Sequence, residues 1–517
     1  MRAFRTVLEQ RIKERRQTLE EFAEFAETFA REHGEPGTLS ARHLQRLAAG
    51  RGPHGRPLGP VRPATARLLE QIFDLGIDQL LAPPARPTRP KDGSRTFADL
   101  DEALGWLDER AGWAFGTSRR KVASQLEEVD AGELRERQAR STEALRSDMT
   151  KALLDYYGES VPGHDAYRLR CDNVDVTTSI LTRPMWLDLA CPLTTDTERL
   201  ALDYSAATAT GRDFEAGPAI DRLVEAAAMG VRMANAPVYR LVSVDVRPGR
   251  ISGTVGTASF AEYALGLDLL EGELGDVVTA GPLTGMDLRD RYLPDLASVV
   301  NLTSRLCVGG VVALCAIARE SGDYALLVQE RSGHVLNAAR RLSLVPKGFH
   351  QHLMEPRADV QVSATMLRKM EGELFGRVEV DLTTAERRAA APMHPGRLSA
   401  PMHWLTAEPG RMKLECTGFG LNLVSGNYEF AGLIVINDDE FWTRFGGEIE
   451  ANWEASGMRL YSSLDRELLI HLIHDESWSN EGLFALLQGF RRLGDIGGSR
   501  VDLPMLELIS PPTASGR

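Results

Sequence analysis

Residues 366–376, MLRKMEGELFG, have the residue types and spacing that come closest to a reactive site. Arg368 stands near the start, Glu371 and Glu373 follow at helical spacing, and a glycine closes the segment. Carboxylates on a helix can hold a divalent cation, and a bound cation can activate water for hydrolysis. Three interpretations are open: a hydrolytic site, a former site now used for sensing, or a charged helix that faces solvent.

The elements that must position this helix are expected within residues 296–500, as an α/β unit. The apolar run at residues 307–318 predicts a buried strand, and Gly322-Asp323 predicts a turn before the strands YALLVQE and LSLVPKG. After the helix, LECTGFGLNLV and FAGLIVI predict strands, and NEGLFALLQGFRRL predicts a further helix.

The stretches YALLVQERSG, LSLVPKGFHQHLMEP and MLRKMEGELFG together resemble the Nudix superfamily. In that family a strand-loop-helix unit holds Mg²⁺ on three glutamates of one helix face and cleaves nucleoside diphosphate derivatives. Gly348 matches the glycine of the family's sequence box, and Arg368 matches its arginine. The resemblance implies an α/β/α domain.

This sequence departs from the family at the metal positions, which hold Lys369, Gly372 and Glu373. Glu371 lies about 100° or more away from that helix face, and Glu355 lies one residue too far from the box glycine. A lysine repels Mg²⁺. The resemblance therefore implies a degenerate site without a resident metal or catalytic residue. The alternative is a divergent hydrolase that uses Mg²⁺ with Glu373, Glu371 and Glu355.

The same resemblance implies a small ligand, a nucleotide or a phosphorylated metabolite. Arg331, Lys347, Gly348 and Arg368 are the candidate contacts for its anionic group. Arg368 has a second interpretation, in which it pairs with a carboxylate of its own helix.

A second group of residues with a chemical pattern lies near the N-terminus. Residues 36–69 contain six arginines and no acidic residue, although the chain has a net charge of −13. Such a basic segment suits a phosphate backbone. In SARHLQRLAAG, Ala41, Leu44 and Leu47 share one face, which leaves polar side chains for solvent or base edges. Gln and Arg are residue types that pair with adenine and guanine in the major groove.

The stretches RRQTLEEFA, LSARHLQRLAAG and RPATARLLEQIFDLGIDQLLAPP resemble the Xre-type (lambda-repressor-like) helix-turn-helix family. The resemblance covers residues 1–83, although EFAETFAREHGEPG is longer than the family's usual turn. It implies a recognition helix and double-stranded DNA as a partner. The candidate DNA contacts are Ser40, Arg42, His43, Gln45, Arg46 and Arg51. A small helical protein-interaction module is the alternative.

The length of 517 residues allows about three domains, and the pattern predicts an α+β multidomain chain. The predicted parts are an all-α helix-turn-helix domain at 1–83, a Pro-rich linker at 84–96, a helical connector at 97–157, an α/β middle domain at 158–295, the Nudix-like domain at 296–500 and a tail at 501–517. The connector could carry a homodimer contact. In the middle domain, VYRLVSVDVRPGRISGTVG predicts a hairpin.

The five scattered cysteines form no CxxC pair, which favours a reducing compartment over a disulfide framework or a zinc ribbon. The first residues show no secretory signal, and the longest apolar run is too short to span a bilayer. We therefore expect a cytoplasmic protein without a membrane partner.

Other candidate sites are weaker. His350 and His352 with Glu355, or His471 with His474, do not form a recognisable metal motif. Cys315 lies in an apolar segment and is interpreted as a small buried hydrophobic residue.

Three functions follow from these patterns. The first is a cytoplasmic, homodimeric, DNA-binding transcriptional regulator whose degenerate Nudix-like domain senses a ligand. The second is a divergent Nudix-type hydrolase of nucleoside diphosphate derivatives. The third is a protein-interaction scaffold.

Overall fold

The structure is a computed structural model of the chain. It describes residues 6–14, 19, 22–23, 26, 29–30, 39, 41–48, 61, 63–73, 76–82, 100–158, 161–205, 214–231, 233, 235–280, 285–352, 356–375, 393, 398–449 and 454–509. The chain divides into two compact units, unit 1 at Met1–Gly93 and unit 2 at Ser94–Arg517.

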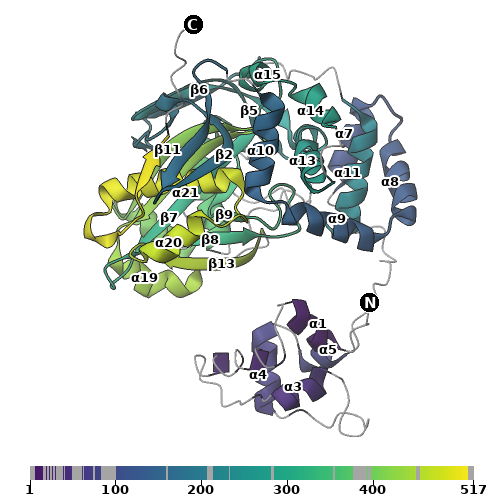
Figure 1. Ribbon diagram of the computed structural model, residues 1–517, viewed down its shortest axis with the longest axis vertical. Helices are drawn as coiled ribbons and strands as arrows, with labels where there is room; N and C mark the ends of the chain where they lie inside the picture. The colour runs from purple at the N-terminus through teal and green to yellow at the C-terminus, as the bar shows by residue number, and fades with distance from the viewer. Residues whose placement is uncertain are drawn as a thin grey trace. The chain divides into compact units, whose positions relative to one another are not determined.

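Unit 1 is helical in its described part. Its helices are α1 (Val7–Glu14), α3 (Ala41–Ala48), α4 (Pro63–Phe73) and α5 (Ile77–Leu81) (Figure 1). Leu8, Leu44, Leu47 and Leu68 belong to one buried apolar cluster, which these helices share. The helices predicted from SARHLQRLAA and ATARLLEQIFDL are thus confirmed as α3 and α4. Most of EFAETFAREHGEPG lies outside the described residues.

Unit 2 is a mixed α/β structure built on a large mixed sheet. The sheet order is β13 (Ala455–Ser462), β8 (Tyr324–Arg331), β7 (Gly309–Ala318), β12 (Tyr428–Ile436), β11 (Met412–Asn422), β2 (Val174–Thr182), β1 (Asp165–Cys171) and β14 (Leu506–Leu508). β7 and β12 run parallel, and the other neighbours in this order are antiparallel. β3 (Cys191–Pro192), β9 (Leu342–Leu344) and β10 (Lys347–Phe349) pair beside this path.

The strands predicted for residues 307–318, YALLVQE, LECTGFGLNLV and FAGLIVI are confirmed as β7, β8, β11 and β12. LSLVPKG differs from its prediction, because it forms two short strands instead of one. β9 pairs with β8, and β10 pairs with β7. Pro346 lies between them and has no N–H to donate to a continuous ladder.

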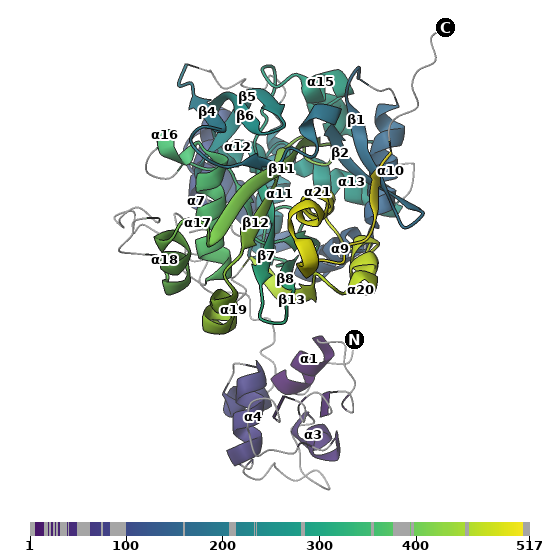
Figure 2. The same ribbon diagram turned by 90° about the vertical axis from the view of Figure 1, so that its left-hand side faces the viewer.

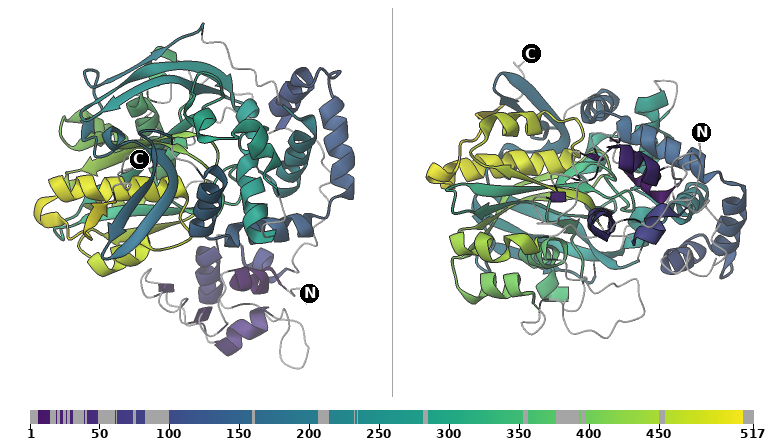
Figure 3. Two further views of the ribbon diagram at one scale, coloured as in Figure 1. Left: turned by 45° about the horizontal axis from the view of Figure 1, so that its top comes forward. Right: turned by 90° about the horizontal axis from the view of Figure 1, so that it is seen from below.

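Helices cover both faces of this sheet, and the alternation of β7 shows why. Val311, Ala313 and Cys315 join the apolar cluster that includes α17 (Val362–Leu374). Val312 and Leu314 join the cluster of α20 (Arg466–Ile473) and α21 (Asn480–Ile496). A strand buried on both faces needs a continuous apolar run. Figures 2 and 3 show the yellow helices α20 and α21 across the sheet from the green helices α18 (Ala400–Ala407) and α19 (Asp439–Phe445).

A smaller sheet contains β4 (Glu198–Leu202), β6 (Arg250–Ser259) and β5 (Pro237–Arg247). β5 and β6 pair antiparallel and confirm the predicted hairpin, which turns at Gly249 with a φ of 74°. Glycine adopts this left-handed conformation without the steric cost of a side chain.

The predicted connector forms α7 (Asp101–Arg110), α8 (Thr117–Glu128), α9 (Ala131–Glu143) and α10 (Arg146–Tyr157). α7, α8 and α9 pack on α11 (Ala216–Met229), and α9 and α10 contact α13 (Leu269–Ala280) (Figure 1). The remaining helices are α12 (Phe260–Ala264), α14 (Asp287–Tyr292), α15 (Leu296–Val300) and α16 (Pro356–Asp359), with 3₁₀ turns η3 (Pro184–Trp186), η5 (Gly446–Glu448) and η6 (Gly498–Arg500).

The predicted boundary between residues 295 and 296 does not divide the structure. Segments 97–157, 158–295 and 296–500 belong to one compact unit. β2 pairs with β11 through Leu181 and Leu421, and β14, within the predicted tail, pairs with β1. Among the described residues, no helix combines the length and apolar character needed to cross a membrane.

Candidate functional site

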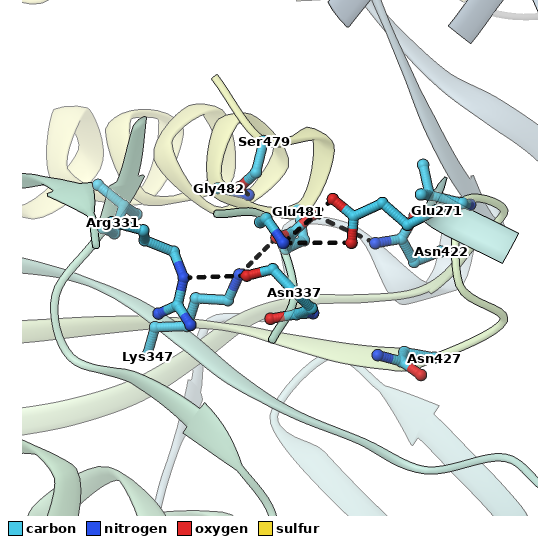
Figure 4. A network of polar contacts seen from close by, with 12 residues as sticks. Glu271, Arg331, Asn337, Lys347, Asn422, Asn427, Ser479, Glu481 and Gly482 are labelled. Carbon is cyan, nitrogen blue, oxygen red and sulfur yellow. Dashed lines mark hydrogen bonds and ion pairs between the residues drawn. The ribbon is translucent and has the colours of Figure 1, made fainter. Parts of the chain in front are cut away.

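A buried ion pair joins the short strand β10 to the first turn of α21. Lys347 Nζ lies 2.5 Å from Glu481 Oε1, and both side chains are less than a tenth exposed. Asn422 Nδ2 donates a hydrogen bond of 3.2 Å to the other carboxylate oxygen, Glu481 Oε2 (Figure 4). Ser479 caps α21 by accepting from Gly482 N, so the acidic Glu481 sits where the helix dipole favours negative charge.

A second buried group lies on α17, the helix that holds the predicted reactive segment. Lys369 Nζ lies 3.0 Å from Glu454 Oε1 and 3.6 Å from Glu373 Oε1. Glu373 Oε2 also accepts a hydrogen bond of 2.9 Å from Lys347 N. The carboxylate predicted as a metal ligand in the hydrolase alternative is thus bound to a cation and to the backbone of this chain.

Gly348 matches the box glycine, and its place beside α17 explains the residue type. A Cβ added at Gly348 would lie 2.1 Å from Lys369 Cε, far closer than the van der Waals contact distance of two carbon atoms. The Lys369 side chain can therefore cross β10 only because position 348 has no side chain. A side chain at position 348 would thus displace Lys369.

The other predicted catalytic carboxylates do not join Glu373. Glu371 accepts hydrogen bonds of 2.6 Å from Ser399 N and Ser399 Oγ, at the start of α18. Glu355 lies outside the described residues. In the described part of the chain, no three His, Cys, Asp or Glu side chains are grouped to hold a metal ion.

The predicted anion contacts are mostly occupied by internal partners. Lys347 pairs with Glu481, Arg331 NH1 lies 3.9 Å from Glu454 Oε2, and Arg331 Nε donates to Asn337 O. Arg368 differs from these, because it is buried and makes no hydrogen bond with another described residue.

Burial and nearby charges shift the pKa values of two neighbouring carboxyl groups, Glu481 and Glu429, in opposite directions. Burial opposes ionisation of Glu481, but the Lys347 ammonium brings the pKa of Glu481 below its usual range. Burial raises the pKa of Glu429 to about 8, and the Glu481 charge acts in the same direction, while Lys347 and Arg331 oppose it. One carboxylate is thus held ionised and the other neutral at pH 7.

We predict that Glu429 makes the protein less stable as pH rises. Its pKa is above the unfolded value, so its contribution to folding is complete below about pH 4.3 and is lost up to about pH 8. Glu429→Gln keeps a neutral side chain and should flatten this fall, by about 1.4 kcal/mol for each unit between the folded and unfolded pKa values. Urea unfolding at pH 5 to 8 measures it. Parallel plots of unfolding free energy against pH for the wild type and Glu429→Gln would contradict this prediction. Glu467→Gln, on the exposed face of α20, is the control.

A cavity of about 710 Å³ lies beside this network, between α8, α9, α11 and α13. A smaller cavity of about 20 Å³ is lined by the start of α21 and by Asn422. The two share Met149, Glu271 and Arg341 in their linings. Glu271, Asn337, Asn422 and Glu481 are seen together in Figure 4.

The candidate DNA contacts lie on α3 of unit 1. Gln45 and Arg46 are exposed, His43 is half-buried, and Leu44 and Leu47 are buried. Arg42 belongs to α3, but its side chain is outside the described residues, as are Ser40 and Arg51. Within α3, Gln45 and Arg46 on the face predicted to read base edges are thus exposed to solvent.

Two of the weaker candidate residues, His350 and Cys315, are buried in the protein core. His350 is fully buried with Nδ1 3.0 Å from the Tyr428 hydroxyl, and burial lowers its pKa to about 3. Burial also raises the pKa of the Cys315 thiol to about 12, so this residue is not a ready nucleophile.

Sequence reasoning missed Glu481, Glu454, Glu429, Asn422 and Glu271. The available signal was a set of polar residues inside apolar stretches, such as Asn422 and Glu429 in LNLVSGNYEFAGLIVI. Charged residues in such places are rarely buried unless they are paired. No protein-family model matches the chain, and no curated protein matches it either.

Proposed function

We propose that the protein is a cytoplasmic, DNA-binding transcriptional regulator whose unit 2 senses a small ligand. One observation carries the proposal: α3 buries Leu44 and Leu47 in the core of a separate helical unit while it exposes Gln45 and Arg46. An exposed polar face on a short helix, in a basic segment, suits insertion into the major groove. The proposal includes a homodimer, in which two copies of α3 contact two half-sites.

The geometry around α17 favours sensing over the hydrolase alternative. Lys369 neutralises Glu373, and Glu371 is turned toward Ser399. An Mg²⁺ ion at this helix would have to displace the lysine and compete with its positive charge. Unit 2 nevertheless holds a cavity of about 710 Å³, a size typical of small-molecule sites.

We predict that Gln45→Ala and Arg46→Ala relax the sequence preference of DNA binding. A duplex selected from a random library by the wild-type protein should bind more tightly than a scrambled duplex, and each variant should lose about 1–3 kcal/mol of this difference. Fluorescence anisotropy at several salt concentrations measures both affinities. The wild-type affinity should fall steeply with salt, because binding releases counterions from DNA.

Arg250→Ala is the matched control, since it removes an exposed arginine from the β5–β6 turn of unit 2. Unchanged preference in both α3 variants would remove the proposed recognition helix. Failure to enrich any duplex, together with a stable protein partner bound through unit 1, would favour the scaffold alternative.

A further inference from the structure

The larger cavity of unit 2 is lined by more acidic than basic side chains, whereas the small cavity has two of each, Glu271 and Glu481 with Arg146 and Arg341. Among the described residues that line the larger cavity there are seven carboxyl groups and three guanidinium groups. Burial raises the pKa of Asp268 to about 7 and also raises the pKa of Glu271 and of Glu273, so these three carry less than a full negative charge. An outer hollow lined by α8 and α9 shares Glu128 and Arg137 with it and adds the charged residues Asp130, Glu133, Glu136 and Arg140. Carboxylates that line a hollow concentrate cations in it.

Internal ion pairs account for only part of this charge. Arg222 pairs with Glu225 and Asp268, and Arg137 pairs with Asp276. Glu273 accepts backbone N–H groups of Leu288 and Arg289.

Glu128, Asp221 and Glu271 form no ion pair with a described residue. Glu271 accepts only the backbone N–H of Ala338, at 3.1 Å, within the described part of the chain. It lines both cavities. Arg341 lines both cavities as well, and the charges of Lys347 and Arg341 act on the Glu271 carboxyl, but no described cation lies within ion-pair distance of it.

Two neutral polar side chains add a second, independent observation. Ser425 is 2% exposed, lines the small cavity, and its hydroxyl has no hydrogen-bond partner among the described residues. Asn337 is 8% exposed, lines the same cavity, and its side-chain amide makes no hydrogen bond with a described residue (Figure 4). Buried polar groups without partners cost free energy, which a ligand can recover.

The size of the small cavity limits what can enter. About 20 Å³ has room for one group of the size of water. An ammonium group has this size and carries three donors. Glu271, Asn337 and Ser425 supply three oxygen acceptors around the same space.

We propose that these cavities bind a small aliphatic amine cation. The ligand is a diamine. One of its ammonium groups occupies the small cavity against Glu271, Asn337 and Ser425, and the second ammonium group lies among the carboxylates of the larger cavity. The inference rests on the proposed ligand-sensing role of unit 2 and is independent of DNA binding by unit 1.

Isothermal titration calorimetry of the full chain without DNA tests this, with putrescine, its neutral isostere 1,4-butanediol, and AMP. We expect putrescine to bind with a 1:1 stoichiometry, and the other two not to bind. Glu271→Gln should weaken putrescine binding about tenfold or more, because it removes the charged acceptor. Asn337→Ala should weaken putrescine binding several-fold. This substitution breaks no side-chain hydrogen bond among the described residues.

A steric variant gives a test that does not depend on the polar groups. Gly272 lines the larger cavity, and a Cβ added there meets no atom within 4 Å. Gly272→Leu should place a side chain in that space and reduce binding, while it suits the helix better than glycine. Glu467→Gln, away from the cavity lining, should bind like the wild type.

Three results would overturn the proposal: no putrescine binding, equal binding in wild type, Glu271→Gln and Gly272→Leu, or saturation by AMP alone. The last would restore the nucleotide as the ligand class. Since no DNA is present, none of these results bears on the α3 variants, and loss of duplex preference leaves the calorimetry unaffected.

Discussion

Lys347→Met is expected to lower the free energy of unfolding by about 3–5 kcal/mol, because it leaves the buried Glu481 carboxylate without its cation. Lys347 Nζ and Glu481 Oε1 are 2.5 Å apart, and the side chains are 8% and 5% exposed. Glu429, which faces the same carboxylate, adds no positive charge.

Urea unfolding at pH 7 measures the effect, and a double variant tests its cause. Lys347→Met combined with Glu481→Gln removes both charges and should recover much of the loss, since a buried neutral pair escapes the cost of an unpaired ion. Lys151→Met is the control, because its pair with Asp155 lies on the surface and contributes little. A double variant as unstable as Lys347→Met would show that packing, and not charge, causes the loss.

The local elements could be predicted from the sequence because their signals are local. The apolar run of β7, the Pro248-Gly249 turn between β5 and β6, and the amphipathic stretch of α21 each lie within about 20 consecutive residues. The mixed α/β character follows from them. The separation of unit 1 from unit 2 near the Pro-rich linker was also visible in the composition.

The pairing of distant segments could not be predicted in the same way. β2 joins β11 although about 240 residues separate Leu181 from Leu421, so the predicted domain boundary between them has no counterpart. The charge network has the same origin: Lys347 and Glu481 are 134 residues apart, and Lys369 and Glu454 are 85 apart. Sequence reasoning found the lysines but had no means to assign their partners.

Lys369→Glu is expected to cause the other large change, because it places a third carboxylate beside Glu373 and Glu454. Lys369 Nζ lies 3.6 Å from one and 3.0 Å from the other, and all three side chains are nearly buried. Reversing the charge should lower the free energy of unfolding by at least the ~3–5 kcal/mol of a broken buried pair, since mutual repulsion adds to the lost attraction.

The response of this variant to Mg²⁺ tests the resemblance of α17 to a metal-binding helix. The resemblance implies that position 369 once carried a metal ligand, so Lys369→Glu should regain stability with rising MgCl₂, because an ion bound only to the folded state stabilises it by mass action. Thermal unfolding with MgCl₂, and with NaCl at equal ionic strength, separates binding from screening. Lys369→Met is the matched control and should show no such gain. Equal responses of the two variants to Mg²⁺ would contradict the proposed descent of this helix from a metal site. A stability gain confined to Lys369→Glu would support it. In that case the Lys369 ammonium would occupy the position of the former metal ion.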